Sequence, residues 1–194
     1  FALNRPTTLL RAMSTNALST NALSSNASSS NALSSNSSPS RVSLLQFHVT
    51  KDKQTNLATA STFMDRALLT SPSLLILPEI WNSPYSASSF RSYSEILPSI
   101  GDDATTFDCS SSPSVSLILE TARANSVHII GGSIPELSIH DDKTEHVYNT
   151  CLIVSPEGKV VGKHRKMHLF DISVPGGITF KESETLSPGS TPTV

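Results

Sequence analysis

Residues 42–77 constrain the fold more than any other part of the sequence. Residues 42–49 (VSLLQFHV) read as a buried strand, and residues 54–69 follow with apolar side chains at helical spacing. Pro72 closes the predicted helix, and residues 74–77 (LLIL) form a second strand. A strand–helix–strand unit this short makes the two strands parallel neighbours in one sheet. The pattern therefore predicts an α/β fold.

The rest of the chain adds a helix and an antiparallel pair of strands. Ser112-Pro113 resembles an N-cap followed by Pro at the first helical position. Pro156-Glu157-Gly158 reads as a turn with Pro at its second position. Loops rich in Pro, Gly, Ser and Thr are expected after Asp171. The predicted elements are a helix over 114–125, a strand over 127–134, and hairpin strands over 146–154 and 159–162.

Residues 1–41 differ in composition from the rest of the chain. From Ser14 a five-residue unit repeats (STNAL, STNAL, SSNAS, SSNAL, SSNSS), and five is neither a helical nor a strand period. We therefore expect a disordered tail over 1–41 and a folded domain over 42–194. The tail has no acidic residue, and its only charges are Arg5, Arg11 and Arg41. That composition is typical of a chloroplast or mitochondrial transit peptide. The alternative is a repeat-expanded tail without a targeting signal, in a cytoplasmic protein.

Overall composition argues against several kinds of partner. A net charge of -2 provides no basic field for nucleic acid, and no apolar run approaches the ~18 residues of a membrane span. The two cysteines, Cys109 and Cys151, form neither a disulfide framework nor a zinc-type pair. The chain begins at Phe1 and stops at Val194, where a strand could be starting. We expect it to be the N-terminal part of a longer protein.

Two charged residues follow strands of the predicted sheet, where ligands of open α/β sheets bind. Glu79 comes directly after the strand at 74–77, and Lys166 follows the second hairpin strand. Taken singly, the first is an ordinary strand-end carboxylate and the second a surface lysine. Together they place a base and a cation near one sheet edge, an arrangement suited to acyl transfer.

The residues supply no evident nucleophile for that chemistry. Cys151 lies mid-strand among apolar neighbours, which indicates a small buried hydrophobe. His164 and His168 are four residues apart in a predicted loop, which does not give the one-face geometry of a helical metal pair. No metal site is predicted. Lys163, at a strand end, is interpreted as a solvated lysine.

Several ordered blocks of the chain resemble motifs of the nitrilase superfamily. The resemblance covers roughly residue 42 to the end, and it is stronger than any single motif. Residues 168–171 (HLFD), 174–176 (VPG) and 178–183 (ITFKES) are similar to the omega-amidase branch. The general blocks are LPEIWNSPY (77–85, the glutamate motif), GGSIPE (131–136), YNT (148–150) and KHRKMHLFD (163–171, the lysine motif).

The resemblance implies an α-β-β-α sandwich and a Glu-Lys-Cys triad. By position, Glu79 would be the general base and Lys166 would stabilise the oxyanion. Glu182 falls where a second, supporting glutamate is expected, while Tyr85 and Phe170 would shape the substrate pocket. The family's nucleophile lies in a segment of the type G-I-C-Y-D, which this sequence lacks. We expect that cysteine to lie beyond the chain given or to be absent.

The resemblance also implies a reaction. The full-length protein would be a hydrolase of linear amide C–N bonds that removes the terminal amide of a dicarboxylate monoamide, such as 2-oxoglutaramate, through a cysteine thioester. Alternatives are an amidase acting on deaminated glutathione and a catalytically dead binding or oligomer partner. We expect a small-molecule amide substrate, a homo-oligomer when full length, no cofactor or metal, and no nucleic-acid or membrane partner. The 194-residue chain itself is expected to be inactive.

Overall fold

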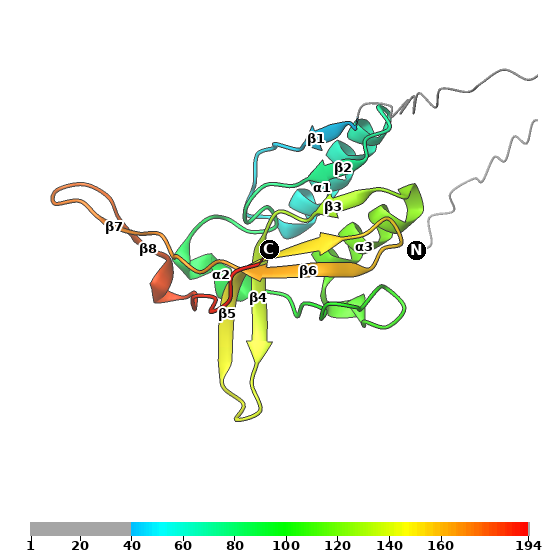
Figure 1. The fold of residues 1–194 in the computed structure, drawn as a ribbon. Helices are drawn as coiled ribbons and strands as arrows, with labels where there is room; N and C mark the ends of the chain where they lie inside the picture. The colour runs from blue at the N-terminus through cyan, green and yellow to red at the C-terminus, as the bar shows by residue number, and fades with distance from the viewer. Residues whose placement is uncertain (1–39, 194) are drawn as a thin grey trace, which may run out of the picture. The chain divides into compact units, whose positions relative to one another are not determined.

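The structure, a computed structural model, describes residues 40–193 (Figure 1). The predicted tail over 1–41 lies outside the described residues except for Ser40 and Arg41. No helix within 40–193 has the length and apolar character to cross a membrane. The elements are β1 (Val42–Leu44), α1 (Lys53–Leu68), β2 (Leu74–Ile76), α2 (Ala87–Tyr93), η1 (Cys109–Ser111), α3 (Pro113–Asn125), β3 (His128–Ile130), β4 (Ile134–Ile139), β5 (Glu145–Val154), β6 (Val160–Arg165), β7 (Asp171–Ser173), β8 (Thr179–Lys181) and η2 (Glu182–Glu184).

Within residues 40–193, six strands form one sheet, and β7 and β8 form a separate hairpin that projects from it (Figure 1). β1, β2 and β3 are parallel, and β5 runs antiparallel to β3, β4 and β6. The parallel pairing of β1 and β2 across α1 confirms the predicted unit. Thr150 of β5 pairs with Ile134 of β4 and with Arg165 of β6, so β4 and β6 lie on opposite edges of β5. β3 and β4 therefore follow one another along the same edge.

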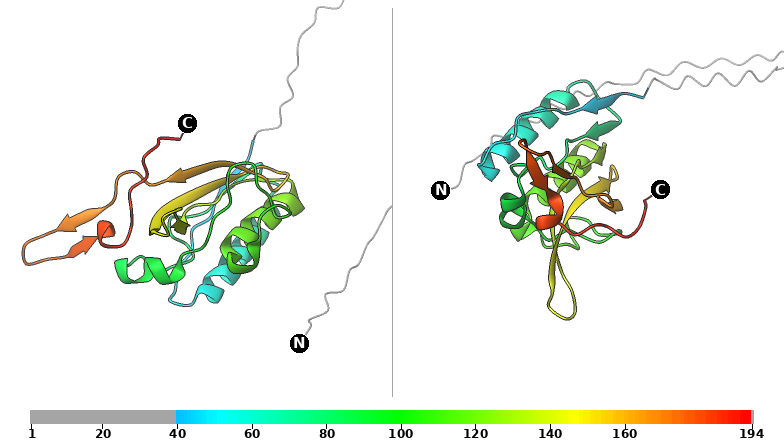
Figure 2. Two further views of the ribbon diagram at one scale, coloured as in Figure 1. Left: turned by 90° about the horizontal axis from the view of Figure 1, so that it is seen from below. Right: turned by 90° about the vertical axis from the view of Figure 1, so that its left-hand side faces the viewer.

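Helices α1 and α3 cover one face of this sheet (Figure 2). Asp52 is the N-cap of α1, and its carboxylate accepts a hydrogen bond from the Thr55 N–H at 2.6 Å. The apolar positions that predicted the two helices point into the core, which confirms the α/β class. The fully buried residues among them are Ala60 and Met64 of α1 and Val115, Ile118, Leu119 and Ala122 of α3.

The start of α3 differs from the prediction. Pro113 opens the helix as expected, but the Ser112 side chain makes no capping bond and donates to the Ile96 carbonyl instead. The cap is the buried carboxylate of Glu95, which accepts from the Ser114 N–H at 3.0 Å and pairs with Lys53 Nζ at 2.8 Å. A carboxylate suits this position because it complements the positive end of the helix dipole.

The strand predicted over 127–134 is also interrupted. Residues 131–133 separate β3 from β4 and lie opposite only two residues of β5, which makes a bulge. Gly132 has φ +60°, and a Cβ there would lie 2.0 Å from the Pro78 carbonyl oxygen. The prediction was wrong in four further places: β1 is shorter than 42–49, and β4, α2 and the β7–β8 hairpin were not expected. The hairpin between β5 and β6 is confirmed.

Candidate active site

The turn after β2 presents Glu79 at the end of the sheet. Ile80 follows with φ +48° and is almost fully buried. A left-handed conformation is a clear outlier for a β-branched residue, and such strain costs about 1–3 kcal/mol and clusters at functional sites. Trp81 is fully buried and donates from Nε1 to the Gly131 carbonyl at 2.9 Å. Packing thus fixes the turn, while the Glu79 side chain stays half exposed.

Lys166 reaches this carboxylate from the end of β6. Its backbone N–H donates to the Asn149 carbonyl at 2.8 Å, which extends the β5–β6 pairing by one residue. Its Nζ lies 3.1 Å from Glu79 Oε1 and 3.0 Å from Glu182 Oε2. The Asn149 side chain donates to Glu79 Oε1 at 2.8 Å. The structure therefore brings together three residues, Glu79, Lys166 and Glu182, that the sequence predicted.

Glu182 begins the short η2 helix and is completely buried. Besides Lys166 it accepts hydrogen bonds from the Tyr85 hydroxyl at 2.5 Å and from the Phe170 N–H at 2.6 Å. The Tyr85 ring packs against Phe180 of β8, with ring centroids 5.5 Å apart. Burial of a carboxyl group without hydrogen-bond partners is costly, so the three partners offset the cost of burying Glu182 and fix its position.

Neighbouring charges set the ionisation of two groups at this site. Burial acts to lower the pKa of Lys166, but hydrogen bonds and negative charge from Glu182 and Glu79 outweigh it and raise the pKa above its ordinary value. Lys166 is therefore a cation throughout the physiological range. Burial, the hydrogen bond to Glu182 and the charge of Glu79 raise the pKa of Tyr85 to about 12. Tyr85 remains a hydrogen-bond donor to Glu182.

A cavity of about 270 Å³ lies over these residues. Tyr85 and Phe170, predicted to shape the pocket, do not line it, and the Phe170 ring is half exposed while its backbone contacts Glu182. Their contact with substrate stays a prediction. Asn149 enters the sequence analysis only as part of the YNT block (148–150), and it lies within a run of buried β5 residues, 147–150. The lining residues are Glu79, Ser133, Asn149, Cys151, His164 and Lys166.

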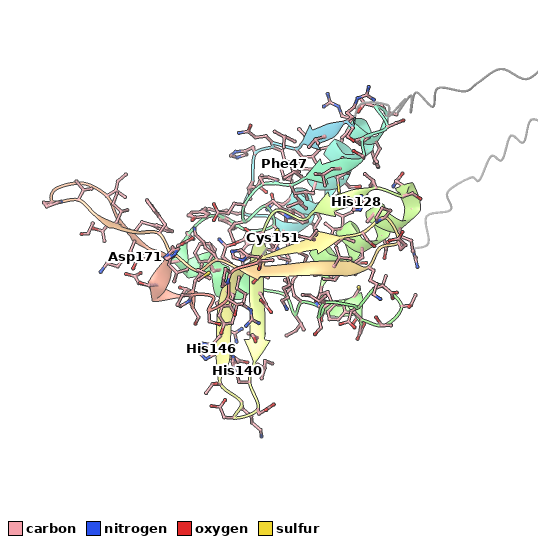
Figure 3. The ribbon with its side chains drawn as sticks, in the orientation of Figure 1. Phe47, His128, His140, His146, Cys151 and Asp171 are labelled. Carbon is pink, nitrogen blue, oxygen red and sulfur yellow. The ribbon has the colours of Figure 1, made fainter. Side chains whose placement is uncertain are left out.

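Cys151 lies mid-strand in β5, directly opposite His164 of β6. Burial raises the pKa of its thiol to about 11, which agrees with the interpretation of Cys151 as a small buried hydrophobe rather than a nucleophile. It nevertheless contributes to the cavity wall. Figure 3 shows Cys151 on the sheet, away from His140 and His146, which lie together on the projecting β4–β5 hairpin. Those two histidines do not contact the cavity.

Lys163 is not the solvated lysine that the sequence suggested. Its side chain is 19% exposed, and its Nζ lies 2.7 Å from Oε1 of the buried Glu136. Arg165 binds the same carboxylate through Nε and Nη2, at 2.8 and 2.7 Å. The prediction failed because Glu136 lies on β4, a strand that was not expected, so no partner for Lys163 was visible.

Glu79 is a half-exposed carboxylate, and Lys166 is a lysine held in its charged form beside the same cavity. Such a pair suits a reaction in which a proton is removed and a negative charge develops. The family comparison agrees with this class of site. The chain belongs to the carbon-nitrogen hydrolase family, whose model matches residues 41–194.

Two curated relatives within this family are omega-amidases. The chain is 42% identical over 153 residues to the chloroplastic omega-amidase of Arabidopsis thaliana, covering 79% of this chain and 38% of that protein. It is 43% identical over 152 residues to omega-amidase NIT3 of Saccharomyces cerevisiae, covering 77% of this chain and 48% of that protein. The chain thus spans about half the length of the curated relatives it matches, or less.

A solved structure shows the same fold. The crystal structure of Saccharomyces cerevisiae Nit3, described as a member of branch 10 of the nitrilase superfamily, superimposes with a TM-score of 0.63 at 39% identity. The match covers 79% of this chain and 50% of that one. The predicted nitrilase-type fold class is therefore confirmed.

Proposed function

We propose that the full-length protein is an omega-amidase, which hydrolyses the terminal amide of a dicarboxylate monoamide such as 2-oxoglutaramate. The observation that carries the proposal is the position of Lys166 Nζ between Glu79 and Glu182, within 3.1 Å of each. The similarity to omega-amidases, at 42–43% identity, supports the substrate class.

In the proposed reaction, Glu79 removes the proton of a cysteine thiol supplied from outside residues 1–194. The thiolate attacks the amide carbon, and Lys166 stabilises the negative charge that develops on the carbonyl oxygen. Collapse of this intermediate breaks the C–N bond, and the amine takes the proton held by Glu79 and leaves as ammonia, which returns Glu79 to its basic form. Water then attacks the thioester, with Glu79 as base, and releases the acid and the thiol. Glu182 keeps Lys166 in place throughout.

The test is to assay the full-length protein for ammonia release from 2-oxoglutaramate and from deaminated glutathione. We expect preference for the first substrate, loss of turnover in Glu79→Gln, and unchanged kcat in Cys151→Ser. Rapid quenching followed by peptide mass spectrometry should find the acyl group on a cysteine other than Cys109 and Cys151. Preference for deaminated glutathione would assign the other amidase branch.

Two outcomes would contradict the proposal. A folded full-length protein that hydrolyses neither amide would favour the alternative that it is a catalytically dead binding or oligomer partner. Ammonia release by residues 42–194 alone, abolished by Cys151→Ser, would show that Cys151 is the nucleophile after all.

An organellar location is part of the same proposal. It is supported by the acid-free, Ser-rich composition of residues 1–41 and by the chloroplastic relative. Fusion of residues 1–41 to a fluorescent protein should direct it to a chloroplast or mitochondrion, and diffuse cytoplasmic fluorescence would contradict this. Assembly into a homo-oligomer also stays a proposal, which the mass of the full-length protein in solution would test.

A further inference from the structure

One residue of the bulge between β3 and β4, Ser133, forms hydrogen bonds to the turn that carries Glu79. Ser133 donates its backbone N–H to the Pro78 carbonyl at 3.1 Å and accepts from the Trp81 N–H at 3.3 Å. Its side-chain Oγ accepts from the Ile80 N–H at 3.0 Å. One serine therefore binds the residues before and after Glu79 through three separate groups.

The hydrogen bond to Ser133 Oγ comes from Ile80, the residue of the turn with a left-handed backbone conformation. Ile80 has φ +48° and is 1% exposed, so its N–H has no water to bind if the Ser133 hydroxyl is removed. A buried N–H without an acceptor favours any movement that returns Ile80 to an ordinary backbone conformation. Such a movement would shift the adjacent Glu79 away from Lys166 and Asn149.

We propose that Ser133 is a positioning residue for the reaction, whose hydroxyl locks Ile80 in the left-handed conformation and thereby aims Glu79 at the cavity. This inference rests on the proposed function, because it assigns Ser133 a role through the general base. Ser133 is 8% exposed and lines the same cavity as Glu79.

Threonine and valine provide a matched pair of substitutions at this position, because they have the same shape and only threonine keeps the hydroxyl. In the full-length protein we expect Ser133→Val to lower kcat by about ten- to a hundredfold with KM within about twofold of wild type, since a displaced catalytic group costs rate rather than binding. Ser133→Thr should retain kcat within about threefold. If valine prevents folding, Ser133→Ala removes the hydroxyl without added bulk.

Ser155 is the control for loss of a serine hydroxyl elsewhere in the fold. It is also 8% exposed, it bonds Glu157 through Oγ at 2.6 Å, and it lies in the β5–β6 turn, away from the cavity lining. Ser155→Ala should lower the Tm slightly and leave kcat unchanged. Equal kcat losses in Ser155→Ala and Ser133→Ala would mean that Ser133 has only a structural effect.

Hydrogen exchange of the Ile80 amide tests the lock without any turnover. We expect exchange at least tenfold faster than wild type in Ser133→Val and unchanged exchange in Ser133→Thr. If the wild type hydrolyses no amide, the proposed function fails, and this measurement still decides whether the lock exists. Equal kcat and equal Ile80 exchange in the valine and threonine variants would overturn the inference.

Discussion

Residues 163–166 supply cations to two charged clusters, in which the numbers of cations and carboxylates are reversed. In one, a single buried carboxylate, Glu136, binds both Lys163 and Arg165. In the other, a single cation, Lys166, lies between Glu79 and Glu182. The first cluster carries an excess of positive charge and the second an excess of negative charge, although their lysines belong to the same short stretch of chain.

The clusters also differ in how completely their carboxylates are bonded. Both oxygens of Glu136 are occupied: Oε1 binds Lys163 and Arg165, and Oε2 binds Arg165 and accepts from Thr150 at 2.6 Å. Within residues 40–193, Glu79 makes all its hydrogen bonds through Oε1, and its side chain is 50% exposed. A fully bonded carboxylate supports structure, whereas a carboxylate with an open oxygen can accept a proton.

Of the cations in the two clusters, Lys166 should have the greatest effect on catalysis. In the full-length protein, Lys166→Ala should lower kcat by about 10²–10³, the usual cost of removing an oxyanion-stabilising donor. The fold should persist, because Glu182 retains the Tyr85 hydroxyl and the Phe170 N–H as donors. Steady-state kinetics and circular dichroism measure the two effects separately.

Lys163→Ala is the matched control for that variant. The sequence alone predicted no effect, but the ion pair with Glu136 changes the expectation to a loss of about 1–2 kcal/mol in the free energy of unfolding. Its kcat should stay within about twofold of wild type. Comparable kcat losses in both lysine variants would remove the distinction between the two clusters.

A medium effect is expected from Glu136→Gln, which should reduce the free energy of unfolding by about 1–3 kcal/mol and leave kcat nearly unchanged. Burial acts to raise the pKa of Glu136, but Arg165 and Lys163 outweigh it and hold the pKa below its ordinary value of 4.5. The stabilisation is therefore fully present above about pH 4.5 and is lost as pH falls through the lower folded-state pKa.

Urea unfolding of wild type and Glu136→Gln across pH 3–7 would measure this dependence, since the difference between them should shrink on the acid side. A difference that does not vary with pH would show that the charge of Glu136 contributes nothing.

The smallest effect concerns the two tyrosines that contact the clusters. Tyr85→Phe removes the hydroxyl that donates to Glu182, and we expect kcat to fall about fivefold because Lys166 is held less firmly. Tyr148→Phe keeps the ring, on which the Arg165 guanidinium lies 3.9 Å from the centroid, and should change neither kcat nor stability. Equal kcat in the two variants would show that the Tyr85 bond has no part in catalysis.

Local patterns in the sequence predicted the elements that depend on local physics. The helical periodicity gave α1 and α3 to within a residue at each end, and the strand ends placed Glu79 and Lys166 near one another. The nitrilase resemblance added Glu182, which local patterns did not join to the site because η2 directly follows the β7–β8 hairpin, a region expected to be loop.

Three of the features that escaped prediction depend on long-range contacts. The cap of α3 comes from Glu95, and the break at 131–133 exists because the Pro78–Trp81 turn occupies that space. The burial of Lys163 depends on a strand, β4, whose sequence (IPELSI) contains a proline and a charge that argue against a central strand. These contacts become visible only when the sheet order is known.

The carboxylate of Glu95 also couples segments that are distant in sequence. It binds Lys53 at the start of α1, the side chain of Asn82 in the loop that follows Glu79, and Ser114 in α3. Its backbone pairs with the chain at Pro135 and Leu137. The start of α3 therefore cannot fray on its own, because its opening would expose a charge that two other segments share. These segments should open as one cooperative unit, so slow amide exchange at Ser114 would report whether the Glu79 loop is intact.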